Sequence, residues 1–535
     1  MIRLTWCAMP LIFVTGALAA PITLTHVANP NPKVAGFSAP NMLSPELTEA
    51  LVAQGSWKLE NPSVLTSYYG YDNDGTLLPA PGALPSPGQP VEASKTEPDK
   101  NTYLVLSGQH GADTQYDYGT HFLFQGHETG TAGYITRINL DADGDHHITL
   151  MATTDTQGNP LPLIDGSTWD PFAQRLLFTS ENGSGGGVWQ ATLDYPSSVE
   201  DLKGILGQGG YEGIQTDNRG RIIIVEDVGG STGTANPHAK RPNSFIYRFL
   251  PNNPANLKAG GKLQALQVMS RSHSGPIAFG TNADDDIKSQ DQKDLHTYGL
   301  RFQTAWVTLH DTAQGTAPFN ANALAKALKA TPFKRPENGQ FRPGTNFSEF
   351  IFDATGDTNA LTEAGSEFGG FGAIFRLRMS GDSGTLSLVY RGDVAHTGLD
   401  NCGFWSANKI VFVEDAGDGL HAQRNALDSA YLFDLNADYS DTSEQPVRIL
   451  AEGRDASATL DSSLLAFPGA QNEGDNEITG WHLSDGDPTA SGLLGAKIPA
   501  PFANGWRLFY TQQHGDNNTW EVLRNNPPSN GANGE

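Results

Sequence analysis

The sequence contains little cysteine and little positive charge. Of its 535 residues only Cys7 and Cys402 are cysteines, and 59 Asp and Glu stand against 34 Lys and Arg, which gives a formal net charge of −25. Two cysteines cannot build a disulfide-rich fold or a cysteine-rich zinc site. The negative charge opposes binding to nucleic acid or to anionic lipid. Beyond the first twenty residues no apolar run approaches the roughly 18 residues of a transmembrane helix, so no membrane span is expected.

The first nineteen residues have the pattern of a secretory signal peptide. Arg3 precedes an apolar stretch, Leu4–Val14, which is followed by a segment of mostly small residues, Thr15–Ala20. Because Pro21 directly after a cleaved bond is unfavourable, we expect cleavage after Ala19 and a secreted or periplasmic location. Cleavage also removes one of the two cysteines, which excludes an internal disulfide.

The rest of the sequence is rich in turn residues and in short β-type runs. Glycine and proline account for 60 and 33 residues. Residues 20–100 are expected to form a proline-rich arm, with a helix over Ser44–Ala53. A second helix is expected over Asn320–Leu328, inside Gly260–Pro343, which has the composition of an inserted loop region. Residues 101–525 have the pattern of a β domain, and five of its expected strands are Tyr103–Leu106, Arg175–Phe178, Arg221–Val225, Lys409–Val413 and Arg507–Tyr510.

An internal repeat indicates a β-propeller. Glu212–Asp227 aligns with Asp400–Asp415 at an offset of 188 residues, and each segment opens with an acid, carries a basic residue before an apolar strand, and ends in Glu-Asp. Arg175–Glu181 aligns with Arg221–Asp227 at an offset of 46. Since 188 is close to four times 46 or 47, the period matches one four-stranded blade of roughly 40–50 residues. We predict an all-β propeller, with six blades favoured over seven, long insertions and an extended N-terminal arm.

Acidic residues near the strand ends are candidate metal ligands. In a propeller the innermost strands surround a central channel, so residues at their ends converge although they are far apart in sequence. Clustered carboxylates repel one another unless a cation lies among them, and Ca²⁺ accepts six to eight oxygen ligands in irregular geometry. We therefore expect a calcium site formed by Glu128, Glu181, Glu212 and Asp400.

Several phrases of the sequence resemble the PhoX-type alkaline phosphatase family over roughly residues 100–520. These phrases are His127-Glu128, Gly166–Trp169, Leu177–Asn182, Tyr211–Gly213, Asn476–Gly480 and Phe509–His514. The resemblance implies an exported six-bladed propeller that hydrolyses phosphate monoesters with calcium and iron in an axial carboxylate cage. It adds Glu477 to the metal ligands. Independently of the resemblance, His514 follows an apolar strand and begins a polar stretch at the expected channel mouth, so we expect it to orient the substrate or protonate the leaving alcohol.

The chain departs from the family pattern at two places. The family's Cys-Glu-Glu-Asn run, whose thiolate binds iron, is replaced by Thr179–Asn182, so calcium is expected and iron is disfavoured. The family's Arg-Pro-Glu is replaced by Gly398–Asp400, which keeps an acid and lacks the guanidinium that would bind a phosphate. Lys240 and Arg241 are the nearest cations that could bind the substrate instead.

The sequence favours a calcium-dependent hydrolase of small phosphate esters, in which the metal polarises the phosphoryl oxygen and activates a water. Two alternatives stay open. A propeller that hydrolyses lactones or sugar esters with one calcium ion would use the same carboxylates and no phosphate clamp. A non-catalytic exported binding propeller would use the same face only as a platform.

Overall fold

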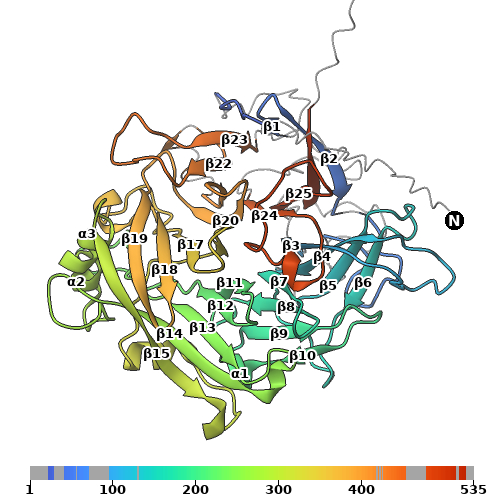
Figure 1. Cartoon of the computed structure of the whole chain (residues 1–535), viewed down its shortest axis with the longest axis horizontal. Helices are drawn as coiled ribbons and strands as arrows, with labels where there is room; N and C mark the ends of the chain where they lie inside the picture. Colours follow the sequence, from blue (N-terminus) through green and yellow to red (C-terminus); the bar gives the residue numbers. More distant parts are fainter. Residues whose placement is uncertain are drawn as a thin grey trace, which may run out of the picture.

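The computed structural model describes residues 22–28, 41–55, 57–70, 96–128, 132–416, 420, 423–424, 426–452, 477–513 and 517–525. The described strands form a ring of blades around a central axis (Figure 1). The expected signal peptide, most of the proline-rich segment before Pro98, and His514 lie outside the described residues.

Six blades follow one another along the chain, each of them antiparallel with its first strand innermost. Blades 1 to 3 consist of β3 (Pro98–Val105), β4 (His121–His127), β5 (Ile135–Asn139), β6 (Ile148–Ala152); β7 (Ser167–Asp170), β8 (Arg175–Ser180), β9 (Gly187–Ala191), β10 (Val199–Asp201); and β11 (Tyr211–Thr216), β12 (Ile222–Glu226), β13 (Ile246–Pro251), β14 (Gly261–Val268). Blades 4 to 6 consist of β16 (Gly339–Phe341), β17 (Glu349–Ala354), β18 (Ala373–Ser380), β19 (Ser383–Arg391); β20 (Leu399–Phe404), β21 (Lys409–Glu414), β22 (Ser429–Asp434), β23 (Val447–Ala451); and β24 (Glu477–Ser484), β25 (Arg507–Gln513), β26 (Asn518–Arg524).

The innermost strands close a ring. The strands β3, β7, β11, β16, β20 and β24 contact one another in this order, and β24 returns to β3. The predicted propeller and its favoured count of six blades are therefore confirmed. The five strands expected from the sequence fall in β3, β8, β12, β21 and β25, and the last four are all second strands of their blades. The repeat offsets thus align equivalent strands.

The N-terminal segment completes the last two blades. β2 (Leu47–Ala53) pairs antiparallel with β26 and supplies the fourth strand of blade 6, while β1 (Met42–Leu43) pairs with β23 at the edge of blade 5. The helix expected over Ser44–Ala53 is therefore wrong. β26 would otherwise present an unpaired edge, and pairing there also buries Val52 and Ala53 against blade 1, which outweighs a local helical pattern.

The region Gly260–Pro343 is more ordered than the sequence suggests. It contains the 11-residue strand β15 (Arg301–Asp311), which pairs with β14 on one side and β19 on the other and so joins blades 3 and 4 into one nine-stranded sheet. The helix expected over Asn320–Leu328 is confirmed as α4 (Ala321–Ala327), where the Asn320 side chain accepts a hydrogen bond from the backbone of Ala323. The other described α-helices are α1 (Lys203–Leu206), α2 (Ala283–Ile287) and α3 (Gln290–Leu295).

The hydrophobic core is divided among the six interfaces between blades. In β12, Ile222 and Ile224 face blade 2 whereas Ile223 and Val225 face blade 4. β21 alternates in the same way between blades 4 and 6. Because successive side chains of a strand point to opposite faces and both faces are buried, these strands are continuous apolar runs. This packing leaves the inner strand ends at the axis for polar residues.

Candidate metal centre

Irregular strand pairing places acids at the axis in three blades. The register between the first and second strands shifts at Asp99 in β3, at Glu212 in β11 and at Asp400 in β20. A β-bulge inserts one extra residue into a strand and re-aims the neighbouring side chains. All three acids are at most 5% exposed. The shared bulge therefore explains how equivalent acids from separate blades reach one place.

A second set of acids comes from the segments that flank the inner strands. Glu128, Glu181 and Asp227 follow the second strands of blades 1 to 3, while Asp165 and Glu337 precede the inner strands of blades 2 and 4. Together with the bulge acids they form four overlapping groups in which the carboxylate oxygens lie within 4.8 Å of one another: Asp99, Asp165 and Glu212; Glu128, Asp165 and Glu181; Glu181, Asp227 and Glu337; and Glu212, Glu337 and Asp400. We call these eight residues the axial carboxylates.

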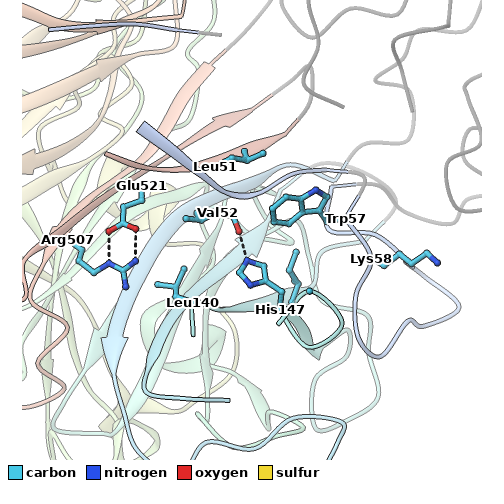
Figure 2. Close-up of a pocket in the computed structure, with 10 residues that line it drawn as sticks. Leu51, Val52, Trp57, Lys58, Leu140, His147, Arg507 and Glu521 are labelled. Atoms are coloured by element: carbon cyan, nitrogen blue, oxygen red, sulfur yellow. Dashed lines mark hydrogen bonds and ion pairs between the residues drawn. The ribbon is translucent and has the colours of Figure 1, made fainter. Parts of the chain in front are cut away.

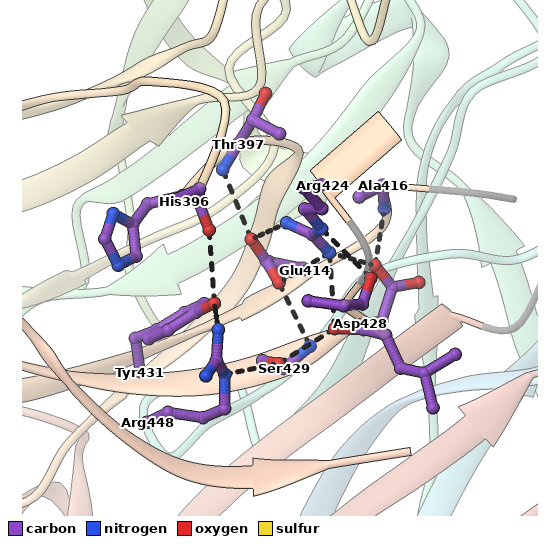
Figure 3. A network of polar contacts seen from close by, with 12 residues as sticks. His396, Thr397, Glu414, Ala416, Arg424, Asp428, Ser429, Tyr431 and Arg448 are labelled. Carbon is purple, nitrogen blue, oxygen red and sulfur yellow. Dashed lines mark hydrogen bonds and ion pairs between the residues drawn. The ribbon is translucent and has the colours of Figure 1, made fainter. Parts of the chain in front are cut away.

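Each Glu-Asp pair of the repeat divides its two acids between different roles. In blade 5, Glu414 points into the blade, where it binds the Arg424 guanidinium at 2.7 and 3.1 Å (Figure 3). In blade 3, the equivalent Glu226 accepts hydrogen bonds from Tyr247 and Asn322. The second acid of each pair, Asp227 or Asp415, is the one near the axis.

Two cations lie among the axial carboxylates. Arg335 binds Asp227 at 2.9 Å and Glu337 at 3.2 Å. Lys100 is 4% exposed and donates hydrogen bonds to two asparagine side chains, Asn338 and Asn401. Two positive charges cannot neutralise eight carboxylates, so the cluster has room for further positive charge.

Burial and mutual repulsion raise the pKa of most axial carboxyls. The pKa of Asp400 rises to about 7, first because the group is buried and then because Asp99 and Asp415 carry like charge. The same two causes, burial first, raise the pKa values of Glu181, Glu212 and Glu337 well above the usual range of glutamate. Burial and mutual repulsion thus favour the neutral form of these carboxyls when no cation is bound.

The donor atoms fit a hard divalent cation. All ligands in the four groups are carboxylate oxygens, which Ca²⁺ and similar ions prefer, and no cysteine or histidine joins these groups among the described residues. In addition, the Glu181 Oε1 atom is buried and has no hydrogen-bond partner in the described structure. A buried unpartnered oxygen is costly, and a metal ion would satisfy it.

The structure brings most of the metal ligands expected from the sequence together. Glu128, Glu181, Glu212 and Asp400 all belong to the axial carboxylates. Glu477 opens β24, and its pKa is raised well above the usual range by burial and by Asp415, Asp400, Glu128 and Asp99, so it adjoins the same cluster.

The two cations expected to bind the substrate, Lys240 and Arg241, lie in different environments. The half-buried Lys240 lies in the electrostatic neighbourhood of Arg335, Asp227 and Glu337, and its pKa is lowered by burial and then by Arg335. Arg241 instead pairs with Asp286 and stacks on the Phe279 ring at 3.7 Å. Cys402 packs in the apolar interface between blades 4 and 5.

Sequence reasoning missed four axial carboxylates and the guanidinium. The missed acids are Asp99, Asp165, Asp227 and Glu337. Arg335 lies in the tripeptide Arg335-Pro336-Glu337 and forms an ion pair with Glu337. That tripeptide was a readable signal, but it lies in the stretch that the composition presented as an insertion.

No protein-family model and no curated protein matches the chain. Solved structures with which it shares a partial likeness include a candidate gluconolactonase, at 12% identity over 68% of this chain and 88% of the other, with a TM-score of 0.28. Sqt1 from Chaetomium thermophilum, bound to the N-terminus of ribosomal protein L10, is 11% identical over 80% of this chain and 97% of the other, with a TM-score of 0.31. A candidate 6-phosphogluconolactonase from Bacteroides uniformis is 10% identical over 65% of this chain and 83% of the other, with a TM-score of 0.28. Likenesses this weak transfer no activity, so function rests on the site.

A separate cavity of about 610 Å³ lies away from the axial carboxylates, between β2 of blade 6 and the start of β6 in blade 1 (Figure 2). Three of its polar side chains already have partners: Arg507 binds Glu521 at 2.7 and 2.6 Å, and His147 donates to the backbone oxygen of Val52. It therefore lacks the convergent titratable groups of the axis.

Among the described helices, none is long and apolar enough to cross a membrane.

Proposed function

We propose that the protein is a calcium-dependent ester hydrolase whose metal is held by the axial carboxylates. The observation that supports this is the convergence of eight acids from five blades in four overlapping groups of three, within each of which the carboxylate oxygens lie within 4.8 Å of one another. Buried like charges cost free energy unless a cation compensates them. Calcium is proposed because the donors are all oxygens and their arrangement is irregular.

When bound, calcium would polarise the ester oxygen and lower the pKa of an attacking water. The protein's own residues would do the rest. The bulges of β3, β11 and β20 would fix the ligand carboxylates, and the axial acids that are not ligands could accept the proton of the water. The surrounding blades largely bury five of these acids, Asp99, Asp165, Glu212, Glu337 and Asp400, which strengthens the electrostatic interactions among them.

A phosphate monoester is the substrate class that Arg335 favours. Its guanidinium lies among the axial carboxylates with Lys240 nearby, so two cations could bind the phosphate oxygens. To do so Arg335 would need donors beyond those it gives to Asp227 and Glu337. Among the described residues its Nη1 atom donates a hydrogen bond to the Thr358 hydroxyl alone, at 3.3 Å, and is the donor that a phosphate could take.

A lactone is the second candidate, and the pairing of Arg335 favours it. The guanidinium is already bound to Asp227 and Glu337, as expected if its role is to neutralise the cluster rather than to bind an anion. A neutral ester would then need only the metal and the water. We also propose export as the setting, on the N-terminal pattern of the sequence.

The test is metal content and turnover of the purified protein. Calcium should co-purify or bind on titration, and p-nitrophenyl phosphate and δ-gluconolactone should be compared as substrates. Arg335→Gln should raise KM for the phosphate ester at least tenfold if Arg335 binds phosphate, and should leave lactone turnover within a few-fold. Arg241→Gln, which alters a guanidinium paired with Asp286, is the matched control and should change neither. Calcium binding without turnover of either ester would leave a binding propeller.

A further inference from the structure

The bulge of β3 carries a lysine where the equivalent bulges carry uncharged residues. Lys100 follows Asp99 in β3, as Gly213 follows Glu212 in β11 and Asn401 follows Asp400 in β20. The ammonium is thereby placed inside the ring of inner strands, where a lysine is rare unless it is partnered. It is 4% exposed.

The contacts of Lys100 are with neutral groups. Its Nζ atom donates to Asn401 Oδ1 at 2.7 Å and to Asn338 Oδ1 at 3.1 Å. Each asparagine in turn donates from Nδ2 to an axial carboxylate, Asn401 to Asp400 and Asn338 to Glu212, both at 3.0 Å. Within the described residues Lys100 forms no direct ion pair. Its positive charge is therefore separated from the carboxylates of Glu212 and Asp400 by one asparagine side chain each.

Electrostatics of the neighbouring acids agree with this geometry. Lys100 interacts electrostatically with Asp400 and with Asp353. A charge that favours the ionised carboxylates also repels a cation that would share them. The contrast is Lys334, whose Nζ is held at 3.0 Å by both oxygens of Asp357 and so contributes little net charge.

We propose that Lys100 is a built-in counter-charge that weakens cation binding at the axial carboxylates and so keeps the bound metal exchangeable. This rests on the proposed metal site, and it makes Lys100 a residue that sets affinity rather than a ligand. In the metal-free protein the ammonium would replace part of the missing positive charge. When a divalent ion binds to these carboxylates, the same ammonium, held by the two asparagines, would repel it electrostatically.

The test is calcium titration by calorimetry, with melting temperatures in chelator and in calcium. Lys100→Met should bind calcium at least about tenfold more tightly than the unmodified protein, about 1.4 kcal/mol, and should melt at a lower temperature in chelator. A merely structural role predicts the opposite sign, because loss of the asparagine contacts would loosen Asp400 and Glu212 and weaken binding. Lys334→Met is the matched buried control and should change calcium affinity less than twofold.

Equal or weaker calcium binding by Lys100→Met overturns the inference. If that variant does not fold, Lys100→Gln removes the charge and keeps an amide donor, and the same sign is required of it. Calcium binding by Lys100→Met with none by the unmodified protein would support the inference while counting against a calcium-dependent enzyme. Normal calcium binding without ester turnover would count against the proposed function alone, and binding by neither protein would overturn both.

Discussion

Metal-free protein should lose stability as the pH rises through neutrality. Asp400 has its pKa raised from 3.8 to about 7 in the fold by burial and by neighbouring acids. A group whose pKa is higher in the folded state gives stability that is fully present below the unfolded pKa and is lost as pH rises through the folded one. The rise in the pKa of Asp400 corresponds to about 4 kcal/mol, which is lost mostly between pH 4 and pH 7. Glu181, Glu212 and Glu337 act in the same direction.

The size of the effect in a melting experiment follows from chain length. At about 2.1 cal/mol/K of unfolding entropy per residue, a folded part of this size has about 1 kcal/mol/K. Between pH 5.5 and the folded pKa of about 7, Asp400 alone accounts for a loss of about 2 kcal/mol, which lowers the melting temperature by about 2 °C. The measurement is scanning calorimetry in chelator between pH 5.5 and 8.5. Calcium should remove most of the fall, and Asp400→Asn should flatten it. A melting temperature in chelator that stays constant or rises over this range would refute the reasoning.

Three further outcomes test the site and the fold. Glu212→Gln should weaken calcium binding at least tenfold by calorimetry, because it removes one axial charge, whereas Glu444→Gln at an exposed position should leave the affinity within twofold. Arg424→Leu should cost about 3–5 kcal/mol in urea unfolding, because it leaves Glu414 buried without its partner; a loss below 1 kcal/mol would argue against this ion pair. Leu508→Ala should cost about 2–5 kcal/mol at the interface of blades 5 and 6, and a smaller loss would indicate loose packing there.

The blade repeat was readable because both faces of a second strand are buried. The runs Ile222–Val225 and Ile410–Val413 are apolar at every position, and the acids around them recur at the same offset. The N-terminal strand β2 was not readable. Its partner β26 lies more than 460 residues away in sequence, and nothing local in Ser44–Ala53 records that pairing.

The site was predictable to the extent that its residues share the repeat. Glu212 and Asp400 were found because they occupy equivalent bulges. Asp99 occupies the same bulge in blade 1, but its strand lacks the Glu-Asp ending that marks the other copies, so the alignment passed over it. Arg335 was not predicted because it lies in the stretch that has the composition of an insertion. The inner strand β16 of its blade is only three residues long, so the sequence there shows no clear strand pattern.

The pairing of β2 with β26 makes the site a property of the whole chain. Blade 6 gains its fourth strand from residues 47–53, and the axial carboxylates extend from Asp99 to Asp400. A growing or truncated chain can form the early blades, yet it cannot shut the ring, because the N-terminal strand has to wait for a partner that ends at Arg524. If the axial carboxylates bind a cation as we propose, fragments that lack the last blade should fail to retain the metal.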